Sequence, residues 1–268
     1  MTWTAFVSGC ESGFGLAIAR RLLSLGHRVV ATAPEPGEWM DRLGSPGPAF
    51  LPLLLDVRDD VAVRDAVSKA LTWGPIDLLV NNAGKGYFAT QEEGDPDAFR
   101  DLLDVNVVGP ARLTRLLLFS LRERKGAIVQ ISSVAGQAVF PESGFYAATK
   151  HALEAMSEAL AQEVGPFGVR VRVIQPGQFA TRFQESATAI SPSPGEDSPY
   201  ASLRTGWQTL RLEVLESPQD PELVADAVLA SLADPAPYLW LPVGADAEQI
   251  LARRRALGTA AWGRAPSR

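Results

Sequence analysis

The chain has 268 residues, of which 46% are hydrophobic and 21% charged, and its net charge is −6. This composition is typical of a folded globular protein, and no apolar run reaches the roughly 18 residues of a membrane-spanning helix. One cysteine and two histidines argue against internal disulfides and metal-ligand clusters, so we expect no metal. The acidic balance disfavours nucleic acid and anionic membranes as partners. No secretory signal opens the chain, so we expect a cytoplasmic protein.

Short runs rich in Val, Ile and Leu alternate with helical patterns along the chain. Continuous apolar runs of this length are typical of parallel strands that are buried on both faces. The predicted strands are Thr4–Ser8, Arg28–Thr32, Phe50–Asp56, Asp77–Asn81, Ala127–Ser132, Val169–Gln175 and Tyr238–Val243. The alternation predicts an α/β fold: a doubly wound, Rossmann-like parallel sheet of about seven strands with helices on both faces, as a single domain over residues 1–268.

Helical periodicity and helix-stop signals fill the intervals between these strands. Gly26 is placed to end the first helix, and two longer helices are predicted at Asp97–Leu121 and Phe145–Val164. Two stretches interrupt the pattern, Pro34–Pro52 and Gln178–Pro221, and both are rich in proline. A long interruption in a compact domain is usually functional or mobile, which directs attention to the second stretch.

The first predicted strand runs into a glycine-rich segment, residues 8–15, with the pattern G-x-x-x-G-x-G before a helix. Gly9 permits a sharp turn, while Gly13 and Gly15 place no Cβ at the start of the helix. A pyrophosphate can then approach free backbone N–H groups and the positive end of the helix dipole. The segment predicts dinucleotide binding, although a glycine-rich turn without a ligand would show the same pattern.

Tyr146 and Lys150 lie four residues apart at the start of a predicted helix and therefore share a face. A phenol, with a pKa of about 10, needs that pKa lowered by about three units, or about 4 kcal/mol, to act near neutral pH. One charge at about 4 Å and an effective dielectric near 20 supplies about that energy. The pair predicts that Lys150 lowers the pKa of Tyr146; the alternative is a solvated helix face.

Together these motifs resemble the short-chain dehydrogenase/reductase family over most of the chain. The segments that carry the resemblance are residues 8–15, Asp56-Val57, Asn81-Asn82-Ala83-Gly84, Asn106, Ile131-Ser132-Ser133, Tyr146-x-x-x-Lys150 and Pro176-Gly177. Ser133 stands thirteen residues before Tyr146, as the catalytic serine of that family does. Residues 103–109 are similar to the branch that contains many hydroxysteroid and retinol dehydrogenases.

The resemblance implies a catalytic set of Asn106, Ser133, Tyr146 and Lys150. Tyr146 would be the general acid in reduction and the general base in oxidation, and Lys150 would lower its pKa and bind the nicotinamide ribose. Ser133 would hold the substrate oxygen and the developing oxyanion. Asn106 would bind a water that links Lys150 to solvent. The residues alone leave simpler alternatives: Ser133 caps a turn, and Asn106 satisfies a backbone kink.

The resemblance also implies a bound NAD or NADP, with residues 56–57 beside the adenine. The expected cofactor contacts are Ser8, Gly9, Ser12, Gly13, Phe14, Gly15, Ala33, Asp56, Val57, Asn82, Ala83, Gly84, Tyr146, Lys150, Pro176, Gly177 and Thr181. The second strand offers neither an acidic nor a basic residue at Ala33 or Pro34, which leaves the choice of cofactor open. Glu11 and Ser12 stand where NADP-preferring relatives often carry a basic residue, which favours NAD slightly.

The function predicted on this basis is that of a nicotinamide-dependent oxidoreductase that interconverts an alcohol and a ketone or aldehyde of a lipophilic small molecule. Residues 178–216 would cover the substrate with Phe179, Phe183, Tyr200 and Trp207. Two alternatives are a non-catalytic dinucleotide-binding sensor or regulator and a nucleotide-sugar epimerase or dehydratase. The substrate itself and the direction of the reaction are not predicted.

A homodimer or homotetramer is also expected. The predicted helices at 97–121 and 145–164 carry more apolar surface than one sheet face requires. The family commonly pairs these helices between subunits.

Overall fold

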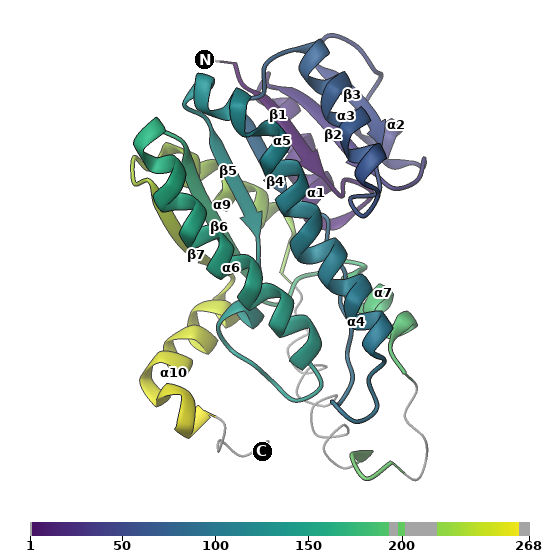
Figure 1. Ribbon diagram of the computed structural model, residues 1–268, viewed down its shortest axis with the longest axis vertical. Coiled ribbons are helices and arrows are strands. Elements are labelled where there is room, and N and C mark those ends of the chain that lie inside the picture. The colour runs from purple at the N-terminus through teal and green to yellow at the C-terminus, as the bar shows by residue number, and fades with distance from the viewer. Residues whose placement is uncertain (1, 193–197, 202–218, 263–268) are drawn as a thin grey trace.

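The computed structural model describes residues 2–192, 198–201 and 219–262 (Figure 1). Within these residues one parallel sheet has the strand order β3-β2-β1-β4-β5-β6-β7. Its strands are β1 Thr4–Ser8, β2 Arg28–Ala33, β3 Phe50–Leu54, β4 Leu78–Asn81, β5 Ala127–Ile131, β6 Arg170–Pro176 and β7 Tyr238–Val243. All the predicted strands are confirmed, as is the doubly wound α/β class.

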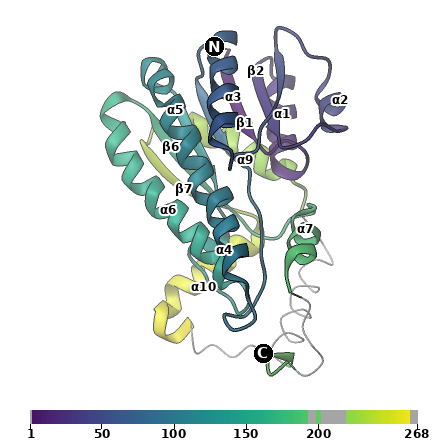
Figure 2. The same cartoon turned by 45° about the vertical axis from the view of Figure 1, so that its right-hand side comes forward.

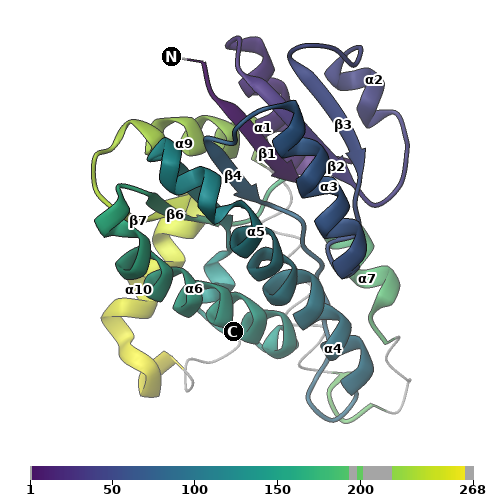
Figure 3. The same cartoon turned by 45° about the horizontal axis from the view of Figure 1, so that its top comes forward.

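Helices cover both faces of the sheet and bury two separate hydrophobic layers (Figure 1). On one face lie α1 Gly13–Ser24, α2 Trp39–Leu43 and α9 Glu222–Ala233. On the other lie α3 Asp60–Trp73, α5 Gly109–Arg124 and α6 Gly144–Val164, which stand in front of the sheet in Figure 3. The apolar strands are buried because each face is covered in this way.

Three further helices lie beyond the carboxyl ends of the strands (Figure 2): α4 Pro96–Leu103, α7 Phe183–Ile190 and α10 Ala245–Trp262. Helix α7 lies inside the long interruption predicted at 178–221, and α2 lies inside the one predicted at 34–52. Both helices are short and free of proline, which is why the composition of the surrounding segments concealed them. In the part of the chain that the structure describes, no helix has the length and apolar character to cross a bilayer.

The helix predicted over 97–121 is interrupted by a π-helical turn, Asp104–Val108, between α4 and α5. Pro110 has no N–H, so the regular bond to the carbonyl of Asn106, four residues back, cannot form. The N–H of Gly109 instead donates to the carbonyl of Asp104, five residues back. Asn106 therefore sits on a widened turn, which changes the direction of its side chain relative to a regular helix.

The strand order reverses at β1, whose two neighbours are β2 and β4. In doubly wound sheets, the loops on either side of such a reversal diverge and leave a crevice at the carboxyl ends of the strands. The glycine-rich segment follows β1, and residues 82–84 follow β4. The fold thus brings two of the predicted binding motifs to the same crevice.

Candidate active site

The glycine-rich segment forms a tight turn in which side chains have no room. Gly9 and Gly13 have φ angles of 72° and 55°, in the left-handed region that glycine adopts without strain. A Cβ on Gly15 would lie 2.0 Å from the carbonyl oxygen of Gly9. Ser12, at the N-cap of α1, makes no side-chain capping bond to the helix. The start of α1 therefore presents backbone N–H groups that no cap covers, as an anionic phosphate requires.

Ser8 and Asn82 fasten the glycine turn to the loop after β4. The Ser8 hydroxyl accepts bonds from the backbone N–H groups of Asn82 and Ala83, each at 3.1 Å. The Asn82 amide donates to the carbonyls of Ser8 and Gly9 at 2.9 and 2.8 Å. Ser8 is itself buried, so its hydroxyl organises the binding loops from behind.

A cavity of about 560 Å³ opens in this crevice. Among the predicted site residues, it is lined by Gly9, Ser12, Gly13, Phe14, Asp56, Val57, Asn82, Ala83, Gly84, Ser133, Tyr146, Lys150, Pro176, Gly177 and Thr181. Four others lie behind its wall: Ser8, Gly15, Ala33 and Asn106. The side chain of Ala33 belongs to the hydrophobic core, and the neighbouring Pro34 lines the cavity at the end of β2 instead.

Tyr146 and Lys150 project from the first turns of α6 toward the end of β5. The Ser133 hydroxyl lies close enough to Tyr146 to act on its pKa, and it accepts a bond from the Ala135 N–H at 3.1 Å. The Lys150 Nζ donates to the carbonyl of Ile131 at 2.9 Å and lies 5.7 Å from the centre of the Tyr146 ring. The predicted serine, tyrosine and lysine are thus brought together in one cavity.

The pKa values of Tyr146 and Lys150 are governed mainly by burial and not by the charge of the lysine. Burial raises the pKa of Tyr146 above its usual range, and only the Ser133 hydroxyl acts to lower it. Burial also lowers the pKa of Lys150 to about 8. Desolvation is the largest effect in this arrangement, and the Lys150 ammonium group is directed at the Ile131 carbonyl, so the lowering of the Tyr146 pKa by Lys150 stays a prediction.

Asn106 joins the loop after β4 to α6. Its amide donates to the Lys85 carbonyl at 2.9 Å and to the Thr149 hydroxyl at 3.0 Å, and its oxygen accepts from the Lys85 N–H at 2.8 Å. A Cβ on Gly84 would lie 3.4 Å from the Asn106 oxygen and 3.7 Å from Lys150 Nζ. Asn106 is 1% exposed, so it holds the cavity wall next to Lys150 from behind.

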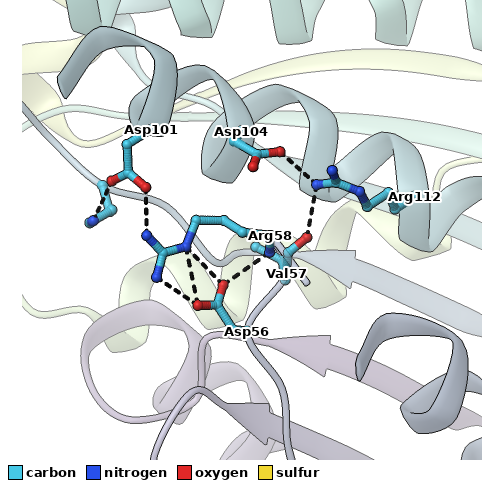
Figure 4. Close-up of polar contacts among 7 residues, drawn as sticks. Asp56, Val57, Arg58, Asp101, Asp104 and Arg112 are labelled. Carbon is cyan, nitrogen blue, oxygen red and sulfur yellow. Dashed lines mark hydrogen bonds and ion pairs between the residues drawn. The ribbon is translucent and has the colours of Figure 1, made fainter. Parts of the chain in front are cut away.

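Asp56 is held by an ion-pair network that sequence reasoning missed (Figure 4). The Arg58 guanidinium donates to both carboxylate oxygens of Asp56 and also binds Asp101 on α4 at 2.5 Å. Lys85 Nζ binds the other Asp101 oxygen at 2.6 Å. These cations hold the pKa values of Asp56 and Asp101 below their usual range. Both Arg58 and Lys85 line the cavity.

A second pair steadies the same loop from the π-helical turn (Figure 4). Arg112 donates to the Val57 carbonyl at 3.2 Å and to the Asp104 carboxylate at 2.6 Å. The loop at 56–58 is consequently tied to α4, to the π-helical turn and to α5.

The side of the cavity next to Tyr146 is bordered by α7, which contributes both apolar and polar residues to the lining. The ring of Phe183 lies 5.4 Å from that of Tyr146, and a Cβ on Gly86 would come within 2.6 Å of Phe183. Phe179 is buried and packs edge-on against Phe14 at 5.2 Å. Tyr200 hydrogen-bonds Glu92 away from the cavity lining, and the predicted Trp207 lies outside the described residues.

Asp246, at the start of α10, fastens the loop that follows β6. One of its oxygens accepts from the Gln178 N–H at 2.7 Å, and the other accepts from the Gln219 amide at 2.7 Å. A Cβ on Gly177 would lie 2.2 Å from the Asp246 carboxylate. The Pro176-Gly177 turn therefore depends on a contact with the C-terminal helix that sequence reasoning did not anticipate.

The doubly wound sheet and the cavity at its crevice define a dinucleotide-binding enzyme of the Rossmann type. Residues 3–190 match the model of the short chain dehydrogenase family. "Oxidoreductase BOA17" from Botryotinia fuckeliana is 34% identical over 251 residues, which cover 92% of this chain and 90% of that protein. The chain belongs to the short-chain dehydrogenase family, as its motifs predicted.

Solved structures lead to the same conclusion. A short-chain dehydrogenase from Streptomyces avermitilis is similar with a TM-score of 0.84 and 36% identity, over 95% of this chain and 92% of that one. Relatives from Burkholderia phymatum, in complex with NAD, and Burkholderia cenocepacia, in complex with NADP, have TM-scores of 0.80 and 0.74. Their sequences are 26% and 27% identical to this one. Both matches cover 95% of this chain, and they cover 92% and 93% of the two related chains. The protein is an NAD(P)-dependent oxidoreductase, which confirms the predicted class of enzyme.

Proposed function

We propose that the protein interconverts an alcohol and a ketone or aldehyde of a lipophilic small molecule, with Tyr146 as the general acid and base. The observation that carries this proposal is the meeting of Ser133, Tyr146 and Lys150 in the lining of one cavity. A nicotinamide ring supplies or accepts the hydride when bound. The chain's own residues bind the substrate oxygen and move the proton.

In carbonyl reduction, the substrate oxygen lies against the hydroxyls of Tyr146 and Ser133. The buried phenol stays protonated near neutral pH because burial raises its pKa, so Tyr146 Oη holds a proton to donate. Ser133 donates a hydrogen bond to the oxygen on which negative charge develops. The Lys150 ammonium, 5.7 Å from the ring, stabilises the phenolate that remains. Oxidation follows the same steps in reverse.

Lys150 also needs a route by which protons reach it from solvent. Asn106 holds the Lys85 backbone beside Gly84, close to the Lys150 Nζ. We infer that this wall seats a water that links Lys150 to solvent, as the family resemblance implies.

The cavity fits a nicotinamide dinucleotide. The uncapped start of α1, with no room for a Cβ at Gly15, would hold the pyrophosphate. The steadied loop at 56–57 would flank the adenine, residues 82–84 would line its ribose, and the turn at 176–177 would face the nicotinamide. Glu11 and Pro34 line the cavity, and the Arg58 cation is already paired with Asp56 and Asp101. NADP carries a 2′-phosphate that NAD lacks, and these residues offer that phosphate no unpaired cation. The arrangement therefore favours NAD.

Calorimetric titration with NAD and NADP tests the cofactor proposal directly. We expect NAD to bind about tenfold more tightly, corresponding to about 1.4 kcal/mol, because a 2′-phosphate would approach Glu11. A carbonyl panel assayed with the preferred reduced cofactor then tests the reaction. Equal or tighter binding of NADP would overturn the preference for NAD, and a panel without turnover would overturn the proposed reaction.

The lipophilic character of the substrate rests on the part of the cavity next to Tyr146. Phe183 lies beside the Tyr146 ring, and the cavity wall also carries the apolar side chains of Val134, Phe140, Ile190 and Ile250. An apolar lining with few polar groups favours the burial of an apolar ligand. A panel that pairs hydrophobic ketones with small polar ones of equal reactivity is expected to show the higher kcat/KM for the hydrophobic members.

We further propose a homodimer or homotetramer built on the face that carries α5 and α6. Phe119 on α5 is 68% exposed, Met156 on α6 is 43% exposed and Val108 is 40% exposed. Large apolar side chains gathered on adjacent helices favour association of identical subunits. Light scattering at micromolar concentration is expected to give two or four times the chain mass of 28.7 kDa, and a monomeric mass would contradict the proposal.

A further inference from the structure

Helix α6 presents three side chains, each four residues from the next, to three successive residues at the end of β5. Tyr146 faces Ser133 in the cavity, where the serine hydroxyl acts on the pKa of the phenol, and Lys150 Nζ donates to the Ile131 carbonyl at 2.9 Å. One turn further on, the Glu154 carboxylate accepts from the Ser132 hydroxyl at 2.6 Å. The first two contacts belong to the proposed catalytic set, whereas the third has no role in it.

The Glu154 carboxylate is buried among neutral hydrogen-bond donors. Its side chain is 5% exposed, and it accepts bonds from the Gln175 amide at 2.9 and 3.0 Å and from the Gln137 amide at 3.4 Å. Gly136 lies so close that a Cβ there would sit 2.0 Å from a Glu154 oxygen. An ionised carboxylate can accept all these bonds, whereas a protonated one would have to give up acceptor capacity. The donors therefore favour a buried negative charge, although burial raises its pKa.

The titratable groups that act on Glu154 or are acted on by it come from two elements. On α6 these groups are Lys150 and His151, which are the basic residues that interact with the Glu154 carboxylate. On β7 the group is Tyr238, whose pKa is raised by burial and by the nearby Glu154 and Glu158 carboxylates. The hydrogen-bond partners from the segment after β5 and from β6 are neutral: Ser132, Gln137 and Gln175. Since His151 is exposed, Lys150 is the buried cation that Glu154 can balance.

We propose that Glu154 is a positioning residue that holds the positive charge on Lys150 and fixes Ser132, and through it the backbone of the neighbouring Ser133. The inference deepens the proposed function and rests on the roles given there to Tyr146 and Lys150. The geometry supports both parts, because one face of α6 places the carboxylate a turn from the ammonium group and in contact with the residue next to Ser133.

The negative charge of Glu154 raises the pKa of Lys150. Burial lowers the pKa of Lys150 to about 8, and the charge of Glu154 acts in the opposite direction. Neutralising Glu154 therefore lowers the pKa of Lys150 further, so that the lysine loses its proton at a lower pH. An uncharged Lys150 stabilises the Tyr146 phenolate less well, which slows the reaction in either direction.

Lysine-selective NMR measures this charge without any turnover. The chain has lysines only at 69, 85, 125 and 150, so the Cε signals of ¹³C-labelled lysine can be assigned by substitution. We expect Glu154→Gln to move the titration midpoint of Lys150 down by about one pH unit. The matched control is Glu158→Gln, which removes a charge from the exposed position one turn further along α6. It is expected to leave the midpoint within about 0.2 units.

Kinetics supply the second measurement. In the wild-type protein, kcat for carbonyl reduction is expected to fall at alkaline pH as Lys150 loses its proton. In Glu154→Gln we expect this fall to occur about one pH unit lower, and we expect KM to change less than about twofold. If Glu154→Gln does not fold, Glu154→Met gives the same test of charge. An unchanged Lys150 midpoint in a folded, neutral variant would overturn the inference. A shifted midpoint in a protein that reduces no carbonyl would leave Glu154 as the counter-charge and overturn the proposed function instead.

Discussion

Tyr146→Phe is expected to reduce kcat for carbonyl reduction about 10³-fold, a loss of about 4 kcal/mol of transition-state stabilisation. The substitution removes only the phenolic oxygen, which lies near Ser133 and, in the proposed mechanism, carries the proton for the substrate oxygen. The ring keeps its contact with Phe183, so the shape of the cavity is retained. Binding of the dinucleotide is expected to change less than about threefold, because the residues proposed to hold its phosphates and adenine lie elsewhere in the cavity.

Steady-state kinetics of the purified variant, together with calorimetry of dinucleotide binding, separate these two effects. Tyr200→Phe is the matched control: it removes the same oxygen from a tyrosine that bonds Glu92 and does not line the cavity. It is expected to keep wild-type kcat. Retention of more than a tenth of the activity by Tyr146→Phe would show that another group transfers the proton. Loss of dinucleotide binding would show that the residue is needed for the architecture of the cavity.

The features that could be predicted from the sequence are those set by neighbouring residues. The central strands β1, β4 and β5 are short, mostly apolar runs that are fully buried, and burial on both faces makes such runs visible without knowledge of their partners. The glycine turn at 8–15 and the tyrosine and lysine of α6 owe their geometry to spacing alone, and the structure gives them that geometry. The fold and most of the lining of the cavity follow from such local signals.

The contacts that hold these residues in place join distant parts of the chain. Asp246 binds the backbone of Gln178 across 68 residues, and Arg58 reaches Asp101 across 43. No periodicity marks such pairs, because the partners meet only when the layers of the fold assemble. The π-helical turn is different, since Pro110 four residues after Asn106 removes a helical hydrogen bond and is visible in the sequence. The position of Glu154 behind Ser132 likewise needed the packing of α6 on β5.

Gly15→Ala is expected to weaken dinucleotide binding at least about 100-fold, or about 2.7 kcal/mol. The new Cβ would lie 2.0 Å from the Gly9 carbonyl oxygen and 2.4 Å from the Asn82 amide nitrogen. Both neighbours are fixed, because the Asn82 amide already bonds the Ser8 and Gly9 carbonyls that shape the turn. The backbone must move to admit the methyl group, and the N–H groups at the start of α1 that are proposed to hold the phosphate move with it. Overpacking of this kind also lowers the free energy of unfolding by about 1–3 kcal/mol.

Gly47→Ala is the matched control for this substitution, because the nearest atom to its new Cβ would be 4.0 Å away. It is expected to bind the dinucleotide with wild-type affinity and to unfold at the same denaturant concentration. Circular dichroism and denaturant titration establish that Gly15→Ala is folded at the temperature of the binding measurement, and calorimetry then gives the dissociation constant of the folded protein. Wild-type affinity in the folded variant would mean that the start of α1 does not hold the pyrophosphate. The Ser8–Asn82 contacts would then shape a structural turn, and the dinucleotide would depend on the loops after β3, β4 and β6 alone.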